Sequence, residues 1–112
     1  MQEILDRLNQ VAGIKGSMVV TAEGYVVIDA LGPDLEKDTV AAVSSQMVKT
    51  SHQMLESLDR GGFGRFTLTS THGRMIFVSL RAGYLVAVTK MQIKLGDILL
   101  EIESAARRIE KS

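Results

Sequence analysis

The sequence contains no cysteine and no tryptophan, and it has only one proline in 112 residues. Without cysteine the chain forms neither a disulfide framework nor a zinc site made of thiolates. The chain also has no excess of positive or negative charge, because 13 basic and 13 acidic residues cancel to a net charge of zero. A nucleic-acid surface needs clustered lysine and arginine, so we expect no binding to nucleic acid.

Long apolar runs are absent as well, since none approaches the roughly 18 residues that a membrane-spanning helix requires. The first eight residues include Glu3, Asp6 and Arg7, which is not typical of a secretory leader. We therefore expect a cytoplasmic protein without membrane insertion. With 46% hydrophobic residues, the chain has enough apolar side chains for one domain that spans residues 1–112.

Apolar periodicity predicts three helices, over residues 2–12, residues 36–60 and about residues 95–109. The middle helix contains neither glycine nor proline over roughly six to seven turns, so it is longer than an average helix. We expect Gly61 and Gly62 to cap its C-terminus. The stripe expected to face the core consists of Val40, Val43, Met47, Met54 and Leu58, with Ser44, Val48, Ser51 and Leu55 alongside.

Five runs of residues have the character of strands. Turns that contain glycine separate neighbouring runs within each group, so these neighbours should pair antiparallel. The first two runs are almost continuously apolar, which predicts cover on both faces. The third run alternates between polar and apolar residues, as is typical of an edge strand. The five runs are Met18–Val20, Tyr25–Ile28, Phe63–Thr71, Arg74–Leu80 and Tyr84–Thr89.

The order helix–strand–strand–helix–strand–strand–strand–helix predicts an α/β sandwich of three layers. We expect a five-stranded antiparallel sheet with the long central helix on one face. The N-terminal and C-terminal helices should cover the other face.

Residues that carry chemistry are few. The two histidines, His52 and His72, are not accompanied by carboxylates in any metal-ligand spacing. Gly61, Gly62 and Gly64 follow a helix and precede a strand, which is the reverse of a phosphate-binding loop. Spacing suggests no arrangement of serine, histidine and aspartate for nucleophilic catalysis. We therefore expect neither a cofactor nor an enzymatic activity.

Several segments in this order carry a family resemblance. They are Val11–Val20 leading into Glu23–Val27, the long central helix, Gly64–Phe66, Arg74–Val78 and Gly83–Val88, and together they extend over essentially the whole chain. The chain thus resembles the Roadblock/dynein light chain family, which includes the bacterial MglB-like regulators of Ras-like GTPases. The resemblance implies a non-catalytic homodimer or heterodimer, formed through the central helix and the third strand. It also implies that the paired helices bind a small Ras-like GTPase.

The candidate interface consists of the face of the central helix that is expected to be exposed to solvent, together with the third strand. Small residues there would let a second helix approach closely, and polar residues would be available to a partner. Two alternatives remain: a structural adaptor in a motor or signalling complex without GTPase binding, or a small-ligand sensor. The residues expected at the dimer or partner interface are Ala41, Ala42, Ser45, Gln46, Lys49, His52, Gln53, Glu56, Arg65, Thr67 and Thr69.

Overall fold

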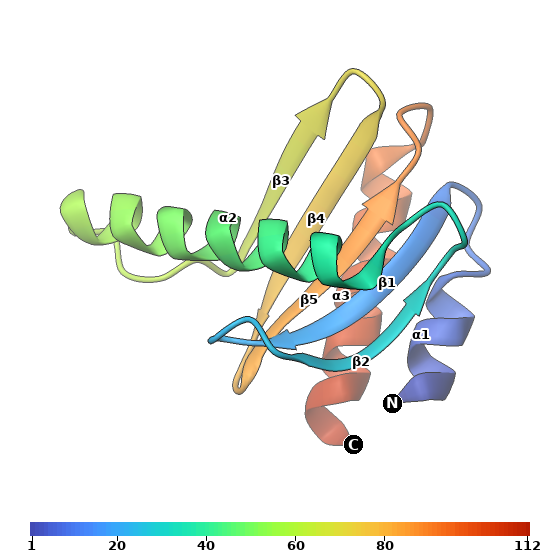
Figure 1. The fold of residues 1–112 in the computed structure, drawn as a ribbon, viewed down its shortest axis with the longest axis horizontal. Coiled ribbons are helices and arrows are strands. Elements are labelled where there is room, and N and C mark those ends of the chain that lie inside the picture. The colour runs from blue at the N-terminus through green and yellow to red at the C-terminus, as the bar shows by residue number, and fades with distance from the viewer.

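The computed structural model describes all residues 1–112 and contains three helices and five strands. The strands form one antiparallel sheet in the order β2-β1-β5-β4-β3. Helix α2 crosses one face of this sheet, and α1 and α3 lie on the other (Figure 1). This confirms the predicted sandwich. The elements are α1 (Gln2–Leu8), β1 (Ile14–Thr21), β2 (Val26–Leu31), α2 (Lys37–Ser57), β3 (Arg65–Ser70), β4 (Gly73–Leu80), β5 (Gly83–Thr89) and α3 (Leu95–Lys111).

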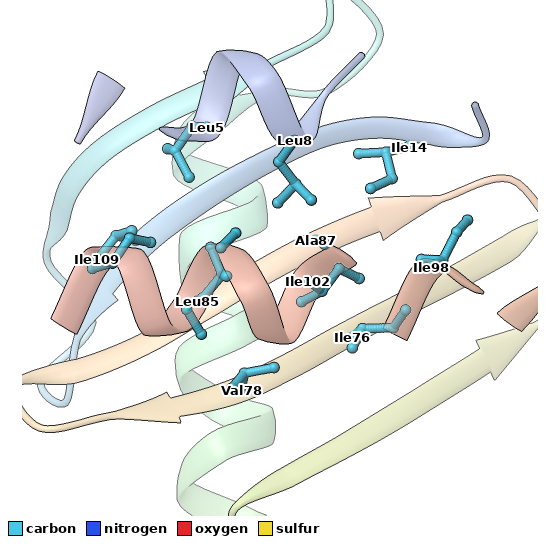
Figure 2. Close-up of a cluster of buried hydrophobic side chains, with 13 residues drawn as sticks. Leu5, Leu8, Ile14, Ile76, Val78, Leu85, Ala87, Ile98, Ile102 and Ile109 are labelled. Carbon is cyan, nitrogen blue, oxygen red and sulfur yellow. The ribbon is translucent and has the colours of Figure 1, made fainter. Parts of the chain in front are cut away.

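The core between the sheet and helices α1 and α3 contains 13 buried residues. Figure 2 shows Leu5 and Leu8 of α1 lying alongside α3, with Leu8 nearest Ile102, and buried residues of both helices share one cluster with Ile76, Val78 and Leu85 of the sheet. Apolar residues recur along α3 at three- and four-residue intervals, so that one stripe of the helix is buried. These contacts hold both terminal helices on the same face.

The core beneath α2 contains nine buried residues and is built around aromatic side chains. Phe77 of β4 is fully buried, and its ring stacks on Phe66 of β3 with the centroids 4.4 Å apart. Tyr84 of β5 lies on its other side at 6.4 Å. Strand β5 contributes to both cores, which explains its continuous apolar sequence.

Strand β2 differs from its prediction, because its two faces are not both fully covered. It is an edge strand, and Val27 is 50% exposed. Val19 of β1 pairs with Ile28 and Val20 pairs with Val26, so Val27 is an extra residue without a partner in the ladder. This β-bulge interrupts the regular hydrogen-bonding row of the β2 edge.

Helix α1 ends at Leu8, four residues before its predicted end. The reason is Asn9, whose side-chain amide donates to the carbonyl oxygen of Ala30 and accepts from the Ser17 hydroxyl. These bonds tie the end of the helix to β1 and β2. An asparagine side chain such as that of Asn9 also competes with the helix backbone for hydrogen bonds, which favours a helix end at this position.

The C-terminus of α2 is not capped by Gly61 and Gly62 as predicted. Asp59 instead adopts the left-handed conformation, with φ 56°. The backbone N–H of Arg60 then donates to the carbonyl oxygen of Leu55 at 2.8 Å. This is a Schellman arrangement, so the helix stops before the two glycines.

The N-terminus of α2 is capped by Glu36, whose carboxylate accepts from the Thr39 hydroxyl and from the backbone N–H groups of Asp38 and Thr39. The Thr39 hydroxyl, followed by the Asp38 N–H, lowers the pKa of Glu36 below its usual value of 4.5. A lowered pKa means that the cap stabilises the fold fully above pH 4.5. The contribution is lost as the pH falls through the folded-state pKa.

We expect Glu36→Gln to lower the free energy of unfolding at pH 7 modestly. The difference from the unmodified protein should shrink as the pH falls below 4.5, because the native carboxylate is then protonated too. Urea denaturation at pH 7 and pH 3 measures both values. Asp34→Asn removes a carboxylate from the same loop, where it caps nothing, and is the matched control. A deficit of equal size at both pH values would contradict this account of the cap.

Candidate partner-binding surface on α2 and β3

Helix α2 extends past the sheet at its C-terminal end (Figure 1). Its buried residues are Val40, Ala41, Ser44 and Val48, and none lies beyond Val48. Figure 1 shows the C-terminal half of the helix extending past the β3 edge. We call residues 49–58, which end at the C-cap Leu58, the free half of α2. It extends past the sheet, and Leu55 is one of its few side chains that pack against the core beneath α2.

Apolar side chains line one side of α2, and this chain covers them only in part. Val43 is 44% exposed, Met54 61%, and Leu58, just after the last turn, 66%. Together with half-buried Met47, they recur at intervals of four and seven residues and so share a helix face. A row of exposed apolar side chains on one element is typical of a surface that another chain covers.

The prediction of which stripe of α2 faces the sheet was wrong in part. The line of Val40, Ser44 and Val48 is buried, whereas Met54 and Leu58 are exposed. Small Ser44 is fully buried, and Ala41 is nearly so. Small side chains at these positions let the helix lie close to the aromatic core.

Two residues predicted for the interface have contacts within this chain. Ala41 is buried in the core beneath α2. Ser45 is half-buried and lies against Gly24, where a Cβ atom would approach the Ser45 hydroxyl to 2.7 Å. These two small residues thus let α2 pack closely against the sheet and against the β1–β2 turn.

The remaining helix residues predicted for the interface are at the surface. His52 also packs on Phe63, with ring centroids 5.0 Å apart, and so fixes the connection between α2 and β3. Ala42, Gln46, Lys49, His52, Gln53 and Glu56 are all exposed.

Strand β3 is hydrogen-bonded on one side only. It pairs with β4 from Arg65 opposite Val78 to Ser70 opposite Gly73, without a bulge. Its other edge has no neighbouring strand, so a regular row of backbone N–H and C=O groups faces outward. Such an edge can accept a strand of another chain.

The side chains of β3 divide between the two faces of the sheet. Arg65 forms an ion pair with Glu103 of α3, so Thr67 and Thr69, at alternating positions, share the α3 face. Phe66 stacks on Phe77 beneath α2. The three predicted residues of β3 therefore do not lie on the same face as those of α2, and only the backbone edge is common to both faces.

A cavity of about 420 Å³ lies beneath the free half of α2. Met54, Leu55 and Leu58 line it from the helix side, and Phe63 and Phe66 from the sheet side. The cavity adjoins the β3 edge, because Arg65 and Phe66 belong to that strand. We call the exposed side of α2, this cavity and the β3 edge the α2–β3 surface.

The rest of the structure holds few groups that could carry out chemistry. No three histidine or acidic side chains converge in a group that could hold a metal ion. No helix combines the length and the apolar character needed to cross a bilayer. The hydroxyl of Tyr84 is buried without a hydrogen-bond partner, and this burial raises its pKa. The nearby Ser45 hydroxyl opposes that rise in pKa, although the two groups are not in hydrogen-bonding geometry.

An open sheet edge beside an uncovered apolar helix is typical of a module that binds other protein chains. The Roadblock/LC7 domain model matches residues 1–90, which is most of the chain, and this protein therefore belongs to the Roadblock/LC7 family. The resemblance predicted from the sequence is confirmed. An uncharacterised protein of the archaeon Methanocaldococcus jannaschii is 28% identical over 110 residues, covering 98% of this chain and 96% of that protein.

Two solved structures show the same fold at low sequence identity. MglB of Myxococcus xanthus has a TM-score of 0.90 and 17% identity, covering 97% of this chain and 84% of that one. A Roadblock/LC7 domain from Streptomyces avermitilis has a TM-score of 0.88 and 14% identity, covering 99% of this chain and 95% of that one.

Proposed function

We propose that this chain is a non-catalytic binding module that dimerises through the α2–β3 surface and regulates or scaffolds a small Ras-like GTPase. The observation that carries the proposal is the free half of α2, where the exposed side chains of Met54 and Leu58 lie beside the unpaired edge of β3. Family membership and the likeness to MglB support the choice of a GTPase. In this proposal residues 1–112 act as one Roadblock-like domain.

Pairing of two β3 edges across a two-fold axis is antiparallel, so both rows of backbone groups form hydrogen bonds. The two sheets then form one continuous sheet. The free half of each α2, which extends past its own β3 edge (Figure 1), would lie over the partner's sheet. That position covers Met54 and Leu58 and fills the cavity beneath the helix. A related chain with the same edge would form the corresponding heterodimer.

The polar side of α2 would remain exposed on such a dimer. Gln46, Lys49, Gln53 and Glu56 are exposed in the single chain, and two copies side by side double that polar area. We propose this area as the GTPase contact. A surface that binds one nucleotide state of the GTPase more tightly shifts its conformational equilibrium toward that state.

The test is capture from the native lysate on the immobilised full chain, in the presence of GDP or of a non-hydrolysable GTP analogue. A small Ras-like GTPase retained in one nucleotide state is the expected result. Its GTP hydrolysis rate, measured with and without this chain, then separates regulation from scaffolding.

Lys49→Glu should weaken that capture, because it reverses a charge on the proposed contact. Lys94→Glu makes the same change before α3 and is the matched control. Capture of other proteins without any GTPase, in both nucleotide states, would contradict the proposal and favour the structural adaptor.

A further inference from the structure

A groove runs between α3 and strands β3 and β4, on the sheet face opposite α2. It encloses about 710 Å³. Val78 and Leu80 of β4 and Ala106 of α3 form its apolar part, and charged side chains make up most of the rest. We call it the α3 groove. It is separate from the apolar side of α2.

Two ion pairs along this groove link α3 to β3 and to the β4–β5 turn. Glu103 pairs with Arg65 of β3. Glu110 accepts the backbone N–H of Arg81 at 2.7 Å, and its other oxygen lies 3.7 Å from Arg81 Nε. The two glutamates are about 10 Å apart along the helix axis, at 1.5 Å per residue. Both carboxylates of the groove are therefore engaged by groups of the sheet.

The remaining charges of the groove are positive. Arg107 and Lys111 line it, and neither forms an ion pair. The sequence predicts a pair between Glu103 and Arg107, four residues apart on α3, but Glu103 pairs with Arg65 instead. Arg107 is left facing solvent between the two engaged glutamates.

We propose that the α3 groove binds an acidic segment of a partner protein. Carboxylates of the segment would pair with Arg107 and Lys111, and arginine can hold a carboxylate through two hydrogen bonds. An apolar side chain of the same segment would lie on Val78, Leu80 and Ala106. A peptide fits better than a small anion, because the free cations border an elongated groove with an apolar floor. The groove and the α2–β3 surface share Arg65 of β3, but the free cations Arg107 and Lys111 belong to the groove alone, so this inference does not rest on the proposed function.

The test uses the full chain and a fluorescein-labelled peptide of about eight alternating glutamate and leucine residues, which when extended is longer than the groove. A glutamine–leucine peptide of equal length is the comparison probe. We expect the glutamate peptide to raise fluorescence anisotropy, with binding that weakens as salt is added. Binding should shift backbone amide NMR signals in residues 78–81 and 103–111.

The double variant Arg107→Glu and Lys111→Glu should bind this peptide about ten-fold more weakly, because attraction becomes repulsion. The matched control, Arg108→Glu with Lys94→Glu, makes the same charge change outside the groove lining and should keep the original affinity. Equal loss in both variants, equal binding of both peptides, or no binding by the unmodified chain would overturn the proposal. Tripolyphosphate that binds as tightly as the peptide would also overturn it, in favour of a small-polyanion site.

Discussion

Replacing Phe77 with alanine is expected to lower the free energy of unfolding by about 3–5 kcal/mol. Phe77 is fully buried, and its ring contacts the rings of Phe66 and Tyr84 on either side. Alanine removes this burial and leaves a cavity between α2 and the sheet. For a domain whose total stability is about 5–15 kcal/mol, the loss is a large share. Urea denaturation at several protein concentrations measures it, because the proposed self-association would add to apparent stability.

Two further variants make this result specific. Phe77→Leu keeps most of the side-chain volume and is expected to destabilise less than Phe77→Ala. Tyr25→Ala removes an aromatic ring from an exposed position next to β2, so its effect should stay within about 0.5 kcal/mol. A loss at Phe77 no larger than the loss at Tyr25 would show that the aromatic cluster beneath α2 does not hold the helix.

Replacing Leu58 with glutamate is expected to abolish self-association at micromolar concentration. Burial of a leucine side chain contributes about 1.5–3 kcal/mol, and a two-fold interface contains each residue twice. The combined loss of about 3–6 kcal/mol weakens the dimer at least a hundred-fold. Sedimentation velocity over a concentration series measures the change.

Leu100→Glu is the matched control for this prediction. Leu100 of α3 and Leu58 are both 66% exposed, so the two substitutions make the same chemical change at equal exposure. Leu100 lies outside the α2–β3 surface and should leave the association constant unchanged. If both variants remain dimeric, or if both dissociate equally, the free half of α2 is not the interface.

The order and type of the elements were predictable because their signals are local. Glycine in the turns and apolar alternation lie within a few residues of each strand that they define. The length of α2 that the sheet covers was not predictable in the same way. Val40 and Leu58 are 18 residues apart, or five turns at 3.6 residues per turn, and therefore point in the same direction. Val40 is buried and Leu58 is exposed, because the helix runs past the β3 edge (Figure 1), and periodicity along one helix does not show where the sheet ends.

Long-range partners account for the other differences. Arg65 and Glu103 are 38 residues apart, so no spacing rule joins them, and the local pair of Glu103 with Arg107 was the natural expectation. The bulge at Val27 depends on the register of β1 against β2, which the apolar run alone does not encode. Asp59 adopts a conformation more common for glycine, so the nearby glycines pointed to the wrong cap position.

The two free edges of the sheet are unequal. The β3 edge is regular along its whole length, whereas the β2 edge is interrupted at Val27. A sheet with two regular edges can add copies at both ends and grow into a fibre. With one regular edge, addition of a single copy uses the only site for growth. In the proposed pairing through β3, the extra residue in β2 thus favours a closed pair over an open-ended polymer.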